Sequence, residues 1–344
     1  MDSDGRPTDA IIADALSCGR GPEKWDMVAV LHYRGTREVM EAAHRLTESM
    51  GPDERCLGVD ILAQLGIPTR SFPDEVCAIL IDLLDRERDP DVLQSIATAC
   101  GHNKGFGIVE PLARLRDHPS ADVRQAVVFG LLGQEDECAI RTLMELCEDL
   151  DDDVRNWALF GLGDMIDTDN AEIRQVLLQA VHDSFDAVRG EALKGLARRR
   201  DERAIDPLIG ELLAIAAAEE WWDYAFEAAE NMPDVRLYPA LVAARNSGID
   251  DSTLDHAIAL CRIPSPEEGE DGPTGAAGAC PVCWRRRAFR KSEGWQFCKR
   301  CGWSDDADQR TNPDSKDGYN HSSLNGERAR WRRRLDLARE SSKD

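Results

Sequence analysis

The sequence has no long apolar run and fewer basic than acidic residues, and each of these features argues against a class of protein. No stretch of 18 apolar residues occurs, so we expect no transmembrane helix and no membrane partner. The first ten residues lack the basic start and apolar core of a signal peptide. Lys and Arg number 42 against 65 Asp and Glu, which gives a net charge of −23. So acidic a chain disfavours nonspecific nucleic-acid binding, because phosphate contacts depend on basic side chains.

Cysteine, in contrast, is plentiful, and four of the 11 cysteines form two C-x-x-C pairs near the C-terminus. The pairs are separated by 14 residues, a spacing that suits one tetrahedral zinc ion. Four thiolates leave no open position for water, so we expect one structural Zn²⁺. The predicted ligands are Cys280, Cys283, Cys298 and Cys301. The other seven cysteines are scattered singly through helical patterns, as buried thiols are, and the whole set fits a reducing cytoplasm.

A pattern of about 31 to 38 residues repeats between residues 51 and 200. The clearest copies begin at Asp122, Asp153 and Ala187, with looser copies at Glu54 and Asp91. An amphipathic segment precedes each copy, so each repeat is predicted to be a helical hairpin. These segments are 74–87, 105–116, 136–148, 170–182 and 201–214. A period of this size is typical of an α-solenoid, in which each hairpin buries its apolar face against its neighbours.

The copies can be aligned with one another by their Val residues, taken as position zero. Positions 0, +4, +5 and +8 are apolar and fall on one helix face, the predicted core. Position +7 is glycine in three copies, which predicts close helix packing. Arg124, Arg155 and Arg189 recur at position +1 beside aspartates, and we expect a structural ladder across the inter-repeat turns.

Positions +3 and +6 lie opposite the predicted core and differ between copies. We predict that they face the concave side of the solenoid and bind a protein partner, since aromatic residues are common interface anchors. The alternative is that the aromatics fill gaps between hairpins. The candidate partner-binding residues are Phe129, Trp157, Phe160, Glu191 and Lys194.

The Asp-Val-Arg opening and the Ala-Leu-x-Gly-Leu continuation resemble HEAT repeats, in particular the bacterial phycobilisome-lyase-like HEAT group. The resemblance covers roughly residues 25–260 and implies an all-α fold, a right-handed α-solenoid of HEAT-like helical hairpins. We expect the solenoid to span 1–261, with two capping helices within 1–50 and a capping repeat at 219–261. Residues 262–279 are rich in Pro, Gly and Glu, which predicts a flexible linker and an independently moving C-terminal module.

The segment from Cys280 resembles the cysteine-rich CPCC family of small domains. Cys280-Pro281-x-Cys283, Cys298-x-x-Cys301-Gly302-Trp303 and Asn312-Pro313-Asp314 carry the resemblance, although Val282 replaces a cysteine of the family pattern. We expect a zinc-ribbon-like module over 280–335 and a disordered tail over 336–344. Its arginines and tryptophans suit nucleic-acid contact, but they also suit a module core, a solvated face, or docking on the acidic solenoid.

No sequence feature indicates catalysis. The chain contains no P-loop, nucleophile elbow or dinucleotide fingerprint. The deoxyhypusine hydroxylase type of HEAT-like enzyme requires His-Glu pairs as metal ligands, and none of the seven histidines of this chain is followed by glutamate. We therefore expect a cytoplasmic, non-enzymatic scaffold or adaptor that binds a protein partner, with the zinc module as a second binding unit. The alternatives are a bilin-lyase-like enzyme or chaperone, and nucleic-acid association through the basic tail.

Overall fold

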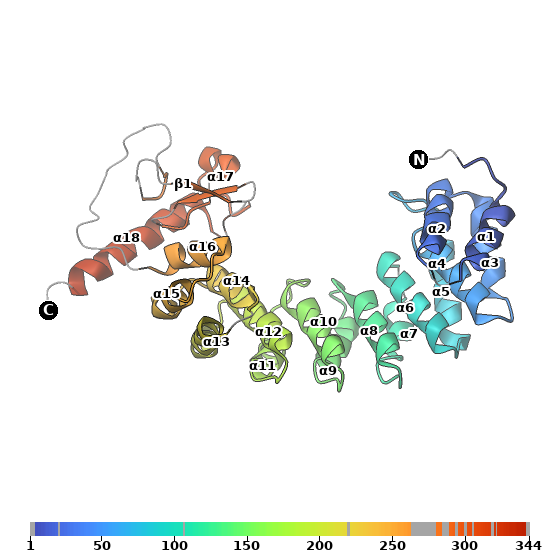
Figure 1. The fold of residues 1–344 in the computed structure, drawn as a ribbon, viewed down its shortest axis with the longest axis horizontal. Helices are drawn as coiled ribbons and strands as arrows, with labels where there is room; N and C mark the ends of the chain where they lie inside the picture. The colour runs from blue at the N-terminus through green and yellow to red at the C-terminus, as the bar shows by residue number, and fades with distance from the viewer. Residues whose placement is uncertain are drawn as a thin grey trace. The chain divides into compact units, whose positions relative to one another are not determined.

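The structure is a computed structural model that describes residues 4–341 apart from a set of short gaps. These gaps are positions 20, 106, 219–220, 263–279, 284–288, 293–294, 299–300, 305, 318–319 and 321. The chain divides into two compact units, Met1–Val176 and Leu177–Asp344. Almost all of the predicted linker therefore lies outside the described residues. Figure 1 shows that helices dominate both units, as the repeat pattern predicts.

The first unit is a row of antiparallel helical hairpins. The later helices of successive hairpins, α4, α6, α8 and α10, pack side by side, and α5, α7 and α9 form a second row (Figure 1). Three helices rather than the expected two precede α4. The bounds are α1 Thr8–Ser17, α2 Glu23–Arg34, α3 Arg37–Thr47, α4 Pro52–Ala63, α5 Pro73–Arg86, α6 Pro90–His102, α7 Val109–Ala113, α8 Ala121–Leu131, α9 Glu137–Leu146 and α10 Asp152–Gly163, followed by α11 Ala171–Ala180.

Several of these helices begin after an aspartate that caps the N-terminus. Asp89, Asp136 and Asp151 precede α6, α9 and α10, and each carboxylate accepts a hydrogen bond from a backbone N–H of the first turn. Helix α7 is shorter than the predicted segment 105–116. Gly107 has φ +84°, a left-handed conformation that delays the helix until Val109.

The predicted core positions are buried in every clear copy. In α8 and α10 the residues at positions 0, +4, +5 and +8 are all 0% exposed. The glycine at position +7 also has the expected role in α8, where a Cβ on Gly130 would lie 2.5 Å from Cδ2 of Leu112 and 2.9 Å from the carbonyl oxygen of Ala97. A larger side chain there would push α8 away from α6 and α7.

The recurrent arginines are structural, and Arg124 and Arg189 link successive hairpins across the inter-repeat turns, as predicted. The guanidinium of Arg124 makes two 2.7 Å bonds to the carboxylate of Asp149 in the next hairpin, and it also donates to the carbonyl oxygen of His118 in its own turn. Arg55 bonds to Glu87 and Arg189 to Glu211 in the same manner.

The second unit continues the hairpins and ends in the cysteine module. Helix α12 packs on α14, α14 on α16, and α13 on α15. The module has a two-stranded antiparallel sheet in which Phe289 pairs with Cys298 and Ser292 with Trp295. The bounds are α12 Asp186–Arg198, η1 Glu202–Ala204, α13 Ile205–Ala217, α14 Tyr224–Asn231, η2 Val235–Leu237, α15 Tyr238–Asn246, α16 Ser252–Cys261, β1 Phe289–Ser292, β2 Trp295–Cys298, α17 Ala307–Thr311 and α18 Leu324–Ser341.

The last helix extends further than expected. Helix α18 reaches Ser341, so the start of the tail predicted to be disordered is helical. Trp331 and Leu335 on this helix are buried, and neither glycine nor proline occurs from residue 327 onward to interrupt it. Within the described part of the chain, no helix has both the length and the apolar composition needed to cross a membrane.

Candidate functional site

The four predicted ligand cysteines come together in the second unit. Cys280 and Cys283 lie on a turn before β1, Cys298 ends β2, and Cys301 follows it. Their four sulfur atoms all lie within 4.8 Å of one another, and the Cys280–Cys301 and Cys283–Cys298 pairs are each 3.5 Å apart. Sulfur atoms about 2.3 Å from a tetrahedral ion are separated by nearly this distance, so the site fits the predicted zinc.

The surroundings of the four sulfur atoms also fit a cation. All four cysteines are at most 3% exposed. Burial raises the pKa of the Cys280 and Cys301 thiols, whereas the hydrogen bond with Cys280 lowers the pKa of Cys298. Four buried thiolates repel one another unless a positive ion balances them. A bound Zn²⁺ would balance that charge and cross-link the two pairs, and four thiolates would fill its tetrahedral shell.

The tryptophans beside the cysteines are core residues. Trp303 is 1% exposed and Trp331 is 5% exposed, and both belong to one buried cluster with the four cysteines and Leu324. A module this small needs large side chains to build a core. The core interpretation is thus confirmed for these two tryptophans, while the side chains of Trp284 and Trp295 lie outside the described residues.

The second cysteine pair rests directly on helix α16. Gly302 has φ +81°, and a Cβ there would lie 2.5 Å from Cγ of Leu260 and 3.2 Å from its backbone nitrogen. The carbonyl oxygen of Gly302 is 2.5 Å from Nε2 of His256, whose Nδ1 lies 2.6 Å from a carboxylate oxygen of Glu230. The ring of His256 therefore links α14, α16 and the turn that carries Cys301 and Gly302. The expected independent motion of the module disagrees with these contacts.

Two arginines of α18 extend the same interface. Arg330 donates to the carbonyl oxygens of Pro233 and Leu260, and Arg334 donates to those of Ala259 and Arg262. The last carbonyl groups of a helix have no partners within the helix, and a positive charge at its C-terminal end interacts favourably with the helix dipole. Docking on the solenoid is therefore the interpretation that fits these two arginines, whereas Arg332 and Arg333 are exposed.

The predicted aromatic face is exposed in the first unit. Trp157 is 43% exposed and Phe129 is 38% exposed, and Phe160 packs edge-on against Trp157 with ring centroids 5.7 Å apart. Phe129 also meets the ring of His102 edge-on at 5.4 Å. Phe129 and Trp157 line a cavity of about 300 Å³ over α6, α8 and α10. Two of the three aromatics thus present large apolar area to solvent.

The two charged candidates have different surroundings. Glu191 is 6% exposed, and its carboxylate lies 3.5 Å from Nζ of Lys194. The same ammonium lies 3.0 Å from the carboxylate of Glu227 and over the ring of Tyr224. The expectation that Glu191 lies on an open face is wrong, because α14 packs against α12 and covers it. Sequence reasoning also missed His256, whose partners are distant in sequence.

The comparisons with known proteins agree with this architecture. HEAT repeats match residues 140–232, and the cysteine-rich CPCC family matches residues 278–334. Protein YibA of Escherichia coli K12 is 30% identical over 235 residues, which cover 67% of this chain and 82% of YibA. The chain belongs to the YibA family. Protein YibA of Escherichia coli O157:H7 matches with the same identity and coverage.

The YibA family likeness extends to a solved structure. The X-ray structure of Escherichia coli YibA superposes with a TM-score of 0.59 and 26% identity, covering 74% of this chain and 91% of YibA. The HEAT-repeat and CPCC resemblances drawn from the motifs are both confirmed. The family match begins the CPCC segment two residues before the first ligand, Cys280, so all four cysteines fall inside it.

Proposed function

We propose that this YibA-family protein is a non-enzymatic adaptor whose solenoid holds a protein partner on the face formed by α6, α8 and α10. The observation that carries the proposal is the exposure of Phe129 and Trp157 beside one cavity. Exposure of a large aromatic side chain to water is unfavourable, and burial of its exposed part against a partner would recover that free energy. Such residues are frequent anchors of protein interfaces.

The second unit has a supporting role in this proposal. Its zinc module covers the end of α16 and so closes the apolar edge that a terminal repeat would otherwise expose. Arg332 and Arg333 remain on its surface as the contact points of a second binding unit. Because Arg330 and Arg334 are engaged with carbonyl groups, fewer basic groups are left for phosphate contacts, which weakens the nucleic-acid alternative.

The test begins with affinity capture of the full chain from native cells and identification of the retained protein. Affinity for that protein is then measured for the wild type, Trp157→Ala and Trp222→Ala. We expect Trp157→Ala to weaken binding by about 2 kcal/mol or more. Trp222, which is 63% exposed in the second unit, is the matched control and should leave affinity unchanged.

Two results would contradict the proposal. Equal affinities of the Trp157→Ala variant and the wild type would show that the partner binds elsewhere. A lower melting temperature with unchanged binding per folded molecule would show that Trp157 is a packing residue. A visible absorption band from a bound chromophore in the purified protein would instead favour the bilin-lyase-like alternative.

A further inference from the structure

Two elements of the zinc module contact α16 at the C-terminal edge of the solenoid. The first is the turn of the second cysteine pair, where the carbonyl oxygen of Gly302 lies 2.5 Å from Nε2 of His256. The ring of Phe297 packs against the same histidine, with ring centroids 4.8 Å apart. The second element is α18, which lies beside α16 in Figure 1 and whose Arg330 and Arg334 donate to carbonyl groups near the end of α16. Because the module and α16 belong to one compact unit, these contacts attach the module to the last hairpin of the solenoid.

Both contacting elements depend on the zinc site for their positions. The turn is formed by the ligands Cys298 and Cys301 and their neighbours. Helix α18 is tied to the first cysteine pair, because Nε of Arg328 donates to the carbonyl oxygen of Pro281 at 2.9 Å. Trp331 on the same helix belongs to the buried cluster of the module, and the four ligand cysteines are four of the nine members of that cluster. A core this small would lose most of its cohesion without the ion that joins the four sulfur atoms.

The end of α16 that meets the module carries a buried thiol. Cys261 is 2% exposed, and its sulfur lies 3.9 Å from the carbonyl oxygen of Ala229 on α14. Burial raises the pKa of this thiol to about 12, and the nearby charges of Arg330 and Arg334 on α18 only partly oppose the shift. The sulfur is therefore enclosed between α14 and the arginines of the module. A buried thiol of this kind is unreactive, so its reactivity reports whether the module is in place.

We propose that zinc loading controls whether the module covers the end of α16, which makes the module a metal-dependent cap of the solenoid. With zinc bound, the module core holds the turn and α18 in the positions that contact α16. When the ion is removed, the module loses that core and detaches, while α16 keeps its packing on α14 and α15 and stays helical. The chain therefore presents different surfaces at its C-terminal edge in the two states. This cap goes beyond the adaptor function, because it involves neither Phe129 nor Trp157.

The test measures how fast the Cys261 thiol reacts with N-ethylmaleimide in the full chain. Each cysteine is followed separately by mass spectrometry of its peptide, before and after EDTA removes the metal. We expect Cys261 to react at least about tenfold faster without zinc, because a covered thiol reacts only when its surroundings open. Zn²⁺ added back before labelling should restore the protection. Labelling of the four ligand cysteines verifies that the ion has left.

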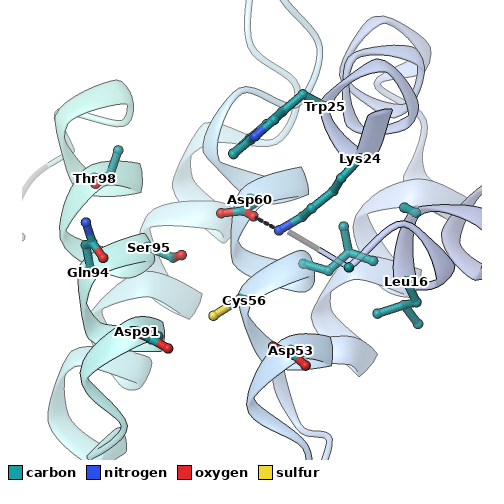
Figure 2. Close-up of a pocket in the computed structure, with 13 residues that line it drawn as sticks. Leu16, Lys24, Trp25, Asp53, Cys56, Asp60, Asp91, Gln94, Ser95 and Thr98 are labelled. Carbon is teal, nitrogen blue, oxygen red and sulfur yellow. Dashed lines mark hydrogen bonds and ion pairs between the residues drawn. The ribbon is translucent and has the colours of Figure 1, made fainter. Parts of the chain in front are cut away.

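Three cysteines of the first unit serve as internal controls. Cys100 and Cys147 are 0% and 6% exposed, and they should stay protected with and without zinc. Cys56 is half-buried and lines the cavity among α1, α2, α4 and α6, which is shown in Figure 2. It should react at one rate in both states, because the proposed change is confined to the second unit.

A pair of double variants separates coverage of α16 from zinc binding itself. Arg330→Gln/Arg334→Gln removes the charged donors of α18 to α16 and leaves every ligand cysteine unchanged. We expect zinc content to stay at one ion per chain and Cys261 to react about tenfold faster, because two charge-assisted hydrogen bonds across the contact are lost. Arg332→Gln/Arg333→Gln removes the same charge from exposed positions of the same helix and should leave the reaction rate unchanged.

Several results would overturn the metal-dependent cap. One is equal reactivity of Cys261 with and without zinc, which includes a protected Cys261 in a chain that carries no metal. Another is reaction of Cys100 and Cys147 as fast as Cys261 after chelation, since the whole chain would then unfold and no single edge would be uncovered. A third is equal reactivity of Cys261 in the two double variants. None of these results concerns partner capture through Trp157, so the cap and the adaptor function fail separately.

Discussion

Replacing Gly302 by alanine is expected to loosen the attachment of the zinc module to α16. Two separate effects combine at this residue. Its φ of +81° is strained for any residue with a Cβ, which costs about 1–2 kcal/mol. The new Cβ would also meet Cγ of Leu260 at 2.5 Å, and overpacking of this kind costs about 1–3 kcal/mol. The total expected loss is therefore about 2–5 kcal/mol.

A second glycine isolates the backbone effect. Gly248, in the turn before α16, has φ +103° and no atom within 4 Å of an added Cβ. Gly248→Ala should thus cost only the conformational part, about 1–2 kcal/mol. A double-mutant cycle with Leu260→Ala isolates the other part. Removing the Leu260 side chain should recover about 1–3 kcal/mol of the Gly302→Ala loss, because the side chain is the nearest obstacle to the new Cβ.

The assay is hydrogen exchange of the α16 amides, measured by mass spectrometry on the full chain. Exchange reports local opening, so it does not require the whole chain to unfold in one step. Zinc content, measured in parallel, should stay at one ion per chain in every variant. Two results would contradict this reasoning: Gly302→Ala opens α16 no more than Gly248→Ala does, or Leu260→Ala recovers none of the protection that Gly302→Ala removes. Either result would show that the close contact between Gly302 and α16 does not hold the module.

Three further predictions concern the metal, the core and an ion pair. Zinc should be present at one ion per chain in the wild type and absent after Cys298→Ser. Chelation should unfold the module and leave most of the helical circular dichroism signal, because metal binding is coupled to folding of the module alone. A zinc content near zero in the wild type would contradict this prediction. Leu162 is 0% exposed, and Leu162→Ala should lower the free energy of unfolding by roughly 2–5 kcal/mol. Leu150 is 99% exposed, and Leu150→Ala should lower it by under about 0.5 kcal/mol. Equal denaturation midpoints of the two variants would show that the core assignment is wrong. Burial acts to raise the pKa of Asp149, but the hydrogen bonds from Arg124 outweigh it and hold that pKa below its usual value. The ion pair therefore stabilises the fold at neutral pH, and this contribution is lost as the pH falls below about 4. The stability difference between wild type and Asp149→Asn should accordingly shrink in acid, and a difference that stays constant from pH 7 to pH 3 would contradict it.

The sequence predicted best those features that repeat. Positions 0, +4, +5 and +8 recur in several copies, so one misleading residue could not hide the core face, and Val123 and Val154 are both fully buried. The cluster of four cysteines was predictable because the spacing of C-x-x-C pairs is local. Gly107 shows the limit of a periodic pattern, since a single left-handed residue shortened α7 without changing the apolar spacing.

Features that depend on contacts between distant segments could not be predicted. The repeat predicts that Arg124 crosses an inter-repeat turn, but it does not identify the partner, which is Asp149 of the next hairpin at 2.7 Å. Glu191 occupies the same repeat position as the exposed Trp157, but the packing of α14 covers it. The contact of His256 with Gly302 joins residues 46 positions apart, and no pattern in the intervening glycine- and proline-rich segment indicates it.

The arginine pairs have a consequence for how chains of this kind change in length. Arg55 and Arg124 each reach forward to a carboxylate of the following hairpin and backward to carbonyl groups of their own turn. A duplicated hairpin would therefore bring both an arginine for its successor and a carboxylate for its predecessor. Insertion or loss of one whole unit leaves these arginines and carboxylates with counterparts at the new junction, whereas a break within a unit does not. Evolution by whole-hairpin steps is thus electrostatically neutral, and that makes the number of repeats easier to vary than the sequence of any single turn.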